Sequence, residues 1–360
     1  MNRDEILHWL HEQDPAQLQI LWARADSSRQ EHVGDAVHLR GLIEFSNYCR
    51  SRCHYCGMRA DRRSLERYRM TAPEILASAR DAVARGYGAI VMQSGEDPGL
   101  DAEWLAQIIE TIKRETPLAV TLSCGERSHD ELARWRKAGA DRYFLRFETS
   151  SKTLWKSIHP PLTKDSPHRL EILRGIKELG YETGSGIMVG IPGQTWASLV
   201  EDIEWFRRLD LDMIGSGPFI PHGETPLGQT SRRAPQHVIS DQVPDTELMT
   251  YKVMALTRLA CPRANIPTTT ALATLNREHG SKLGLERGAN VMMVNLTPPR
   301  YRAFYEIYPA KACIGELPQD QNHRVSTLLA SLGRYAGGGP GTSPNFQLQR
   351  SAEARAVTRS

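Results

Sequence analysis

Short apolar runs rich in β-branched residues alternate along this chain with longer stretches in which apolar residues recur at helical spacing. A short apolar run favours a strand, and apolar residues at i, i+3 and i+4 favour a helix. The pattern predicts eight strands, the seventh of them weak: Leu39–Phe45, Ala89–Gln93, Ala119–Ser123, Arg142–Arg146, Gly184–Val189, Asp212–Gly217, Ile266–Thr270 and Asn290–Val294. Helices are predicted between them: Ala72–Arg85, Ala102–Arg114, His129–Ala138, His168–Leu179, Ala197–Leu209 and Asp245–Leu259.

Strands that alternate with helices pair in parallel through right-handed crossovers. Eight such units over about 260 residues predict an α/β fold class, a (β/α)8 TIM-type barrel of parallel strands. An open doubly wound sheet is the alternative, and the number of strands favours the barrel over residues 39–335. Residues 1–38 are polar with helical spacing, which predicts an N-terminal helical cap. Residues 336–360 contain a glycine-rich run and polar residues, so we expect a flexible tail.

Charge and composition exclude several classes of partner. The formal net charge of +3 is small for 360 residues, and basic residues alternate with acidic ones, so nothing indicates a nucleic-acid or membrane partner. The N-terminus has no apolar segment with a cleavage site, and no stretch of about 18 apolar residues occurs. We therefore expect a cytoplasmic protein with a small-molecule substrate.

Three of the six cysteines crowd into one short segment, directly after the first predicted strand, as Cys49-Arg-Ser-Arg-Cys53-His-Tyr-Cys56. Three thiolates leave one iron of a cubane without a protein ligand, and a small molecule can chelate that iron. The spacing therefore predicts a 4Fe–4S cluster, which the aromatic Tyr55 would shield. A zinc site is the alternative, with His54 as fourth ligand, but His54 is flanked by two ligands and badly placed to close the tetrahedron.

The Cys-x3-Cys-x2-Cys spacing resembles the signature of the radical S-adenosylmethionine (SAM) superfamily. The sequence around this motif, over about residues 5–335, is similar to that of the HydE family of FeFe-hydrogenase maturases, and less similar to those of methylornithine synthase and biotin synthase. Phrases that carry the likeness include Ile43-Glu-Phe-Ser-Asn-Tyr-Cys, Gln93-Ser-Gly-Glu-Asp-Pro and Met188-Val-Gly-Ile-Pro-Gly-Gln-Thr.

The resemblance implies a reaction and its partners. One electron from the cluster would cleave SAM to a 5′-deoxyadenosyl radical, which would act on a small iron–cysteine precursor of the hydrogenase diiron cluster. The implied partners are other hydrogenase maturation proteins and an electron donor such as ferredoxin or flavodoxin. Another radical SAM reaction, such as an amino-acid carbon-skeleton rearrangement, is one alternative, and a non-catalytic cluster-carrying scaffold is another.

The resemblance also implies contacts to SAM, at the carboxyl ends of the strands where barrel enzymes hold their sites. Gln93 and Ser94 take the place of the superfamily's Gly-Gly-Glu motif. An arginine suits the carboxylate of SAM and a glutamate suits its ammonium group. An ordinary ion pair at a helix start is the alternative for both charged residues. The remaining implied contacts are Ser123, Glu148, Arg169 and Met188.

Residues on the substrate side follow from the same resemblance, which implies that Arg142 and Tyr301 are catalytic. It places the threonine run 268–270 and Tyr305 in the inner cavity, although β-propensity and core packing would explain these residues equally.

Two positions depart from the family pattern. Many HydE proteins carry three further cysteines near the C-terminus for a second cluster, but here only Cys313 remains, so we expect one cluster. Phe147 stands where the better-known maturases have histidine, and phenylalanine donates no hydrogen bond. If that histidine serves the substrate, this chain acts on a different one.

Overall fold

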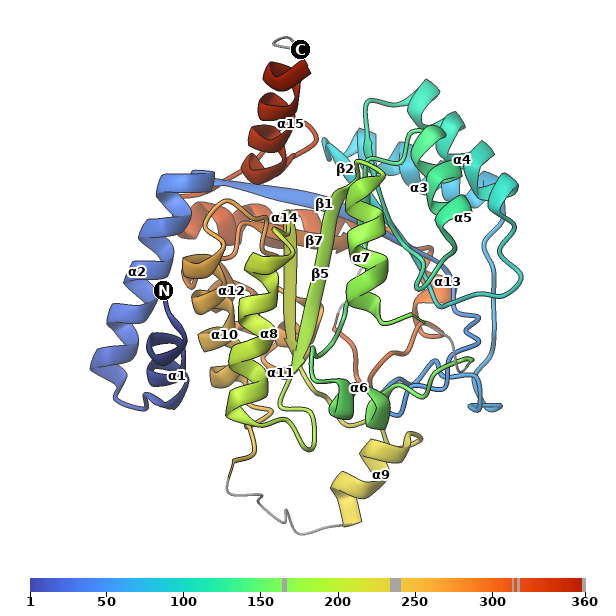
Figure 1. The fold of residues 1–360 in the computed structure, drawn as a ribbon. Coiled ribbons are helices and arrows are strands. Elements are labelled where there is room, and N and C mark those ends of the chain that lie inside the picture. Colours follow the sequence, from blue (N-terminus) through green and yellow to red (C-terminus); the bar gives the residue numbers. More distant parts are fainter. Residues whose placement is uncertain (164–166, 234–240, 313, 316–317, 358–360) are drawn as a thin grey trace.

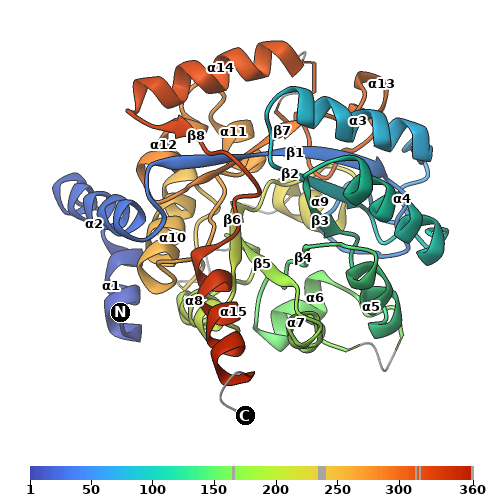
Figure 2. The ribbon, with the colours of Figure 1, turned by 90° about the horizontal axis from the view of Figure 1, so that it is seen from above.

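The computed structural model describes residues 1–163, 167–233, 241–312, 314–315 and 318–357. Within them, seven parallel strands form one curled sheet in the order β6-β5-β4-β3-β2-β1-β7, and β8 pairs with β1 beside this path. Seen from above, the strands curve around a common centre and the helices lie outside them (Figure 2). The strands are β1 (Ala36–Ser46), β2 (Ala89–Ser94), β3 (Ala119–Ser123), β4 (Arg142–Phe144), β5 (Glu182–Val189), β6 (Met213–Pro218), β7 (Val291–Asn295) and β8 (Tyr335–Ala336).

The prediction of a seventh strand over Ile266–Thr270 is wrong, but this segment does lie between β6 and β7, where that strand is expected. Two isolated parallel bridges stand there: Asn265 pairs with Met213 of β6, and Pro267 pairs with Val291 of β7. They join the two edges of the sheet and close the barrel. Proline has no N–H to donate to a ladder, so the pairing with β6 does not continue past Asn265, whereas Thr268 still donates to Val291 of β7 at 3.0 Å. The other seven predicted strands and the parallel α/β class are confirmed.

Helices cover the outside of the sheet, and all six predicted ones are present (Figure 1). The N-terminal helices α1 and α2 pack against α8 and α10, where the buried Nζ of Lys252 donates to the carbonyl of Leu10 at 3.0 Å. Among the described residues, every helix is too short or too polar to cross a membrane. The helices are α1 (Arg3–His11), α2 (Pro15–Val33), α3 (Ala72–Ala84), α4 (Ala102–Glu115), α5 (His129–Lys137), α6 (Lys152–Ile158), α7 (Arg169–Glu178), α8 (Trp196–Arg208), α9 (Pro226–Arg233), α10 (Glu247–Ala260), α11 (Thr270–Leu275), α12 (Gly280–Glu286), α13 (Pro299–Arg302), α14 (Pro318–Ser331) and α15 (Pro344–Val357).

The C-terminal segment packs against the barrel, which corrects the prediction of a flexible tail over residues 336–360. The N–H of Gly337 donates to the carbonyl of Val37 at 2.9 Å, Ser343 is fully buried, and α15 follows. The prediction considered only apolar surface, whereas this segment is held by backbone hydrogen bonds and buried polar groups. Residues 358–360 lie outside the described residues.

Strands β5 and β6 approach each other closely at Gly186 and Gly215, which are paired. A Cβ on Gly186 would lie 1.8 Å from the carbonyl oxygen of Gly215. We expect Gly186→Ala to lower the free energy of unfolding by about 1–3 kcal/mol, because the strands must move apart. Denaturant unfolding measures the change.

Gly175→Ala on α7 is the matched control, because the added Cβ meets nothing within 4 Å. This variant should be neutral or stabilised by up to about 1 kcal/mol, since alanine is the better helix former. Equal unfolding midpoints for the two variants would show that the contact between the strands is not tight.

Candidate active site

A cavity of about 310 Å³ runs from the loops at the carboxyl ends of the strands into the barrel. On β1, the side chains of Arg40, Leu42 and Glu44 line it one after another, because alternate residues of a strand point to the same side. Carboxyl ends of barrel strands are the usual place for an active site, so this cavity is the candidate site.

Cys49, Cys53 and Cys56 all line the mouth of this cavity. Arg67 holds their loop, because its guanidinium donates to the carbonyls of Asn47 and Met58 at 2.6 and 2.9 Å. Burial raises the pKa of all three thiols, that of Cys56 to about 12. Such thiols are neutral at pH 7 until a metal centre takes them as thiolates.

The zinc alternative fits this geometry poorly. His54, its fourth ligand, does not line the cavity. Across the described part of the chain, the one group of three possible His, Cys, Asp or Glu ligand atoms within 4.8 Å of one another does not include the three cysteines. Sulfur ligands of a single tetrahedral zinc lie about 4 Å apart, given Zn–S bonds of about 2.3 Å. At least one pair of the three sulfurs therefore lies more than 4.8 Å apart, which suits ligands to different irons of a cluster.

The residues predicted to contact SAM converge on the same cavity. The ends of β2 and β3, the segment after β4, the start of α7 and the end of β5 each contribute side chains. Near the cysteines, Tyr55 packs against an apolar group that includes Leu154, Met188 and Phe219. The structure thus brings together Tyr55, Gln93, Ser94, Ser123, Glu148, Arg169 and Met188.

Glu148 has a strained backbone at the cavity wall, with a φ of 61°. Left-handed conformation is unusual for a residue other than glycine, and such strain of about 1–3 kcal/mol is concentrated at functional sites. Hydrogen bonds to β5 hold it: its N–H donates to Gly186, and its carbonyl accepts from Met188, both at 3.1 Å. Its carboxylate faces Arg146, whose Nε donates to both oxygens at 3.0 and 3.1 Å.

Arg169 is the centre of a buried polar network at the mouth. Its Nη2 lies 3.0 Å from Glu96 and 2.8 Å from Nε2 of His159, and its Nε lies 2.8 Å from Glu126. Burial, and then Arg169, lower the pKa of His159 to about 2, so a neutral imidazole accepts from the guanidinium. Burial raises the pKa of Glu126. Glu96, Glu126 and His159 lie close enough to hold a metal ion, but the guanidinium already supplies their positive charge.

Glu126 and His159 were not singled out from the sequence. They approach Arg169 from two separate loops, and no local motif marks either residue.

The two residues predicted to be catalytic, Arg142 and Tyr301, do not line the cavity. Arg142 begins β4 at the amino end of the barrel and is fully buried against Glu182; Arg146, four residues later, lines the cavity instead. Tyr301 stacks on Tyr68, with ring centroids 4.5 Å apart, and its hydroxyl donates to Glu74 at 2.9 Å.

Other substrate-side residues lie as predicted, because Tyr305 and the threonines 268–270 line the cavity. Phe147 does not. It is fully buried and packs against Phe206, with ring centroids 5.7 Å apart, so its identity does not affect the cavity. Cys313, on which the prediction of a single cluster depends, lies outside the described residues.

A parallel barrel with three cysteines on the loop after β1, above a cavity that enters the barrel, defines the class of radical SAM enzymes. The Radical SAM superfamily model matches residues 43–206. Members of this superfamily bind a 4Fe–4S cluster and SAM.

Individual relatives show to which family within this class the chain belongs. The [FeFe] hydrogenase maturase subunit HydE of Thermotoga maritima is 44% identical over 319 residues, which cover 89% of this chain and 87% of that protein. The 3-methylornithine synthase of Methanosarcina barkeri is 26% identical over 284 residues, 78% of this chain and 75% of that protein. A crystal structure of methylornithine synthase (PylB) shares the fold, with a TM-score of 0.78 at 24% identity over 93% of this chain and 94% of that chain. This chain therefore belongs to the HydE family of radical SAM enzymes.

Proposed function

We propose that this radical SAM enzyme is a maturase of FeFe hydrogenase that acts on a small anionic metal-complex precursor. The 44% identity to a HydE protein across most of both chains supports this proposal. The cluster and SAM, when bound, supply a one-electron cleavage of SAM. The residues described below would hold these groups and the substrate.

The three cysteines are the proposed ligands of the cluster, because among the cysteines that the structure describes only these three line the cavity. Arg169 is proposed to bind the carboxylate of SAM through its Nη1, one of whose two N–H groups is not used by the protein, while its charge attracts the anion. Glu148 and Ser123 are proposed to bind the polar groups of SAM, and Met188 is proposed to pack against its adenine ring. Gln93 and Ser94 would lie beside the methionine end.

The proposal of an anionic substrate rests on the positive charge at the inner end of the cavity. Arg40 lies there, 3% exposed, and its Nε and Nη2 have no hydrogen-bond partner. Glu44, the cavity-lining carboxylate further along the same strand, is already paired with Lys311 and with Asn295. A buried unpaired cation favours an anionic ligand. A lysine-like substrate would instead need a free carboxylate for its ammonium group.

The same role implies partners. We propose that the protein works in the cytoplasm with other hydrogenase maturation proteins and receives electrons from a carrier such as ferredoxin or flavodoxin. A small-molecule substrate, and neither nucleic acid nor membrane, fits a cavity of about 310 Å³ inside a barrel.

Maturation of apo-hydrogenase in vitro tests the proposal. Hydrogen evolution should appear when the reconstituted protein is added to the other maturation factors, and should stay at background with Arg40→Gln, because the anionic precursor loses its charge partner. Arg277→Gln, on an exposed surface, should leave it unchanged. No activation by a preparation that cleaves SAM would contradict the maturase function and leave a different radical reaction.

A further inference from the structure

The barrel interior is built in layers, and the lowest layer lies beyond the cavity. Side chains two residues apart on a strand point to the same side, so His38, Arg40 and Leu42 follow one another along the barrel axis. Arg40 and Leu42 line the cavity, whereas His38 does not. On β4 and β5 the lowest inward residues, Arg142 and Glu182, also lie outside it. The cavity therefore ends one layer above the amino end of the barrel.

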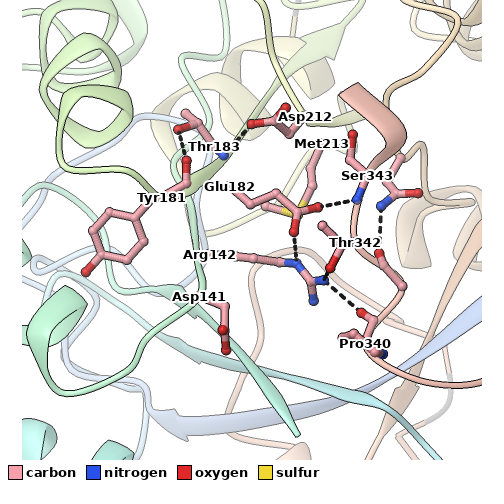
Figure 3. Close-up of polar contacts among 12 residues, drawn as sticks. Asp141, Arg142, Tyr181, Glu182, Thr183, Asp212, Met213, Pro340, Thr342 and Ser343 are labelled. Carbon is pink, nitrogen blue, oxygen red and sulfur yellow. Dashed lines mark hydrogen bonds and ion pairs between the residues drawn. The ribbon is translucent and has the colours of Figure 1, made fainter. Parts of the chain in front are cut away.

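Residues 337–343, here called the floor segment, run from β8 to α15 across that end of the barrel (Figure 2), and Figure 3 shows their polar contacts with Arg142 and Glu182. The Nη2 of Arg142 donates to the carbonyl of Pro340 at 2.8 Å, and the N–H of Ser343 donates to Glu182 at 2.9 Å. Arg142 and Glu182 themselves pair at 2.5 Å, with 0% and 2% of their side chains exposed. A buried ion pair needs partners for its remaining polar atoms. The floor segment supplies them for Nη2 of Arg142 and for the second oxygen of Glu182, whereas Nη1 of Arg142 has none.

The floor segment also fits the strand starts closely. A Cβ on Gly88, just before β2, would lie 1.6 Å from the carbonyl oxygen of Gly339. A Cβ on Gly341 would lie 2.6 Å from the ring of His38. The floor segment is therefore in close contact with the barrel at Gly88 and at His38, where an added Cβ has no space.

Asn265 and Arg40 connect the floor segment with the cavity. Asn265 lines the cavity, and its Nδ2 donates to the carbonyl of Gly341 at 2.9 Å. Burial, and then repulsion by Arg142, lower the pKa of Arg40 to about 9, so its guanidinium is still charged at neutral pH. Water entering from below would satisfy the free donors of Arg40 and compete with a ligand. A closed floor leaves those donors to a ligand that enters from the mouth.

We propose that the floor segment seals the amino end of the reaction cavity, so that substrate and solvent reach its inner end only past the SAM site. The C-terminal segment then acts on the reaction indirectly, because it closes the cavity in which the substrate binds. Closure itself does not depend on the proposed maturase function; only the nature of the excluded ligand rests on it.

Chemical labelling of a cysteine at the inner end tests the seal. Thr121 lines the cavity and its hydroxyl has no hydrogen-bond partner, so Thr121→Cys is a small change. The cluster-loaded Thr121→Cys protein with SAM bound should react slowly with iodoacetamide, as measured by peptide mass spectrometry. Deleting residues 337–360 in that background should speed labelling at least about tenfold, because the reagent then enters from below. Cleavage of SAM without substrate should persist.

Deleting only residues 344–360 is the matched control, because it removes α15 and keeps the floor segment; its labelling rate should equal that of the full chain. If the longer deletion does not fold, Gly88→Val displaces the floor segment at one point and should also speed labelling. Equal labelling rates in the full chain and in the floor-disrupting variants would overturn the proposal. A full chain that matures no hydrogenase, while the labelling rates differ between the variants as predicted, would count against the maturase function alone.

Discussion

Replacing Cys53 with alanine should remove the cluster and abolish SAM cleavage. Cys53 is buried in the wall of the cavity, which Cys49 and Cys56 also line, and two thiolates cannot hold three irons of a cubane. Iron content after anaerobic reconstitution, the visible absorbance of the cluster and the yield of 5′-deoxyadenosine measure the loss. We expect iron close to zero and no 5′-deoxyadenosine above background.

Cys261→Ala is the matched control for this substitution. Cys261 follows α10 as its C-cap and does not line the cavity, so this variant should bind a full cluster and cleave SAM at the rate of the unmodified protein. A Cys53→Ala protein that retained either the cluster or the cleavage would show that the ligands lie elsewhere.

Replacing Arg169 with lysine should leave the cluster intact and weaken the interaction of the protein with SAM. The guanidinium is buried among Glu96, Glu126 and His159. Lysine keeps the charge but loses the planar fork. The loss of one charge-assisted hydrogen bond, about 1.5–3 kcal/mol, corresponds to a fall of roughly 10- to 100-fold in kcat/KM for SAM cleavage.

Arg174→Lys on the same helix is the control, because Arg174 is exposed on α7 and lies over the ring of Trp205. It should change neither the cluster nor the kinetics. An Arg169→Lys protein with normal kcat/KM would exclude Arg169 from the SAM site, and one without a cluster would point to a structural role instead.

The fold could be predicted wherever local pattern and burial agree. Seven strands follow from apolar runs that are buried in the structure, and the parallel topology follows from the helices between them. The eighth strand position could not be settled by pattern, because Pro267 reduces it to isolated bridges. The tail could not be predicted either, because Ser343 is held by the distant Glu182, and such a contact leaves no mark in local composition.

The site could be predicted where the residues lie at strand ends. The cysteines, Ser123 and Glu148 converge because parallel strands finish at one rim. Arg142 is predicted to lie in the site, but it stands at the beginning of its strand and does not line the cavity. Arg146, at the end of the same predicted strand, does line it. Arg40 is not predicted as a site residue, because a single charge inside an apolar run resembles an ordinary strand residue. Only the closed barrel shows that it is buried with two of its three guanidinium nitrogens unpaired.

The most direct measurement is SAM cleavage by the reconstituted protein under dithionite, with no substrate added. A protein carrying a complete 4Fe–4S cluster should convert SAM to methionine and 5′-deoxyadenosine in equal amounts. A fully loaded cluster that yields no 5′-deoxyadenosine would contradict the assignment as a radical SAM enzyme and leave a cluster-carrying scaffold.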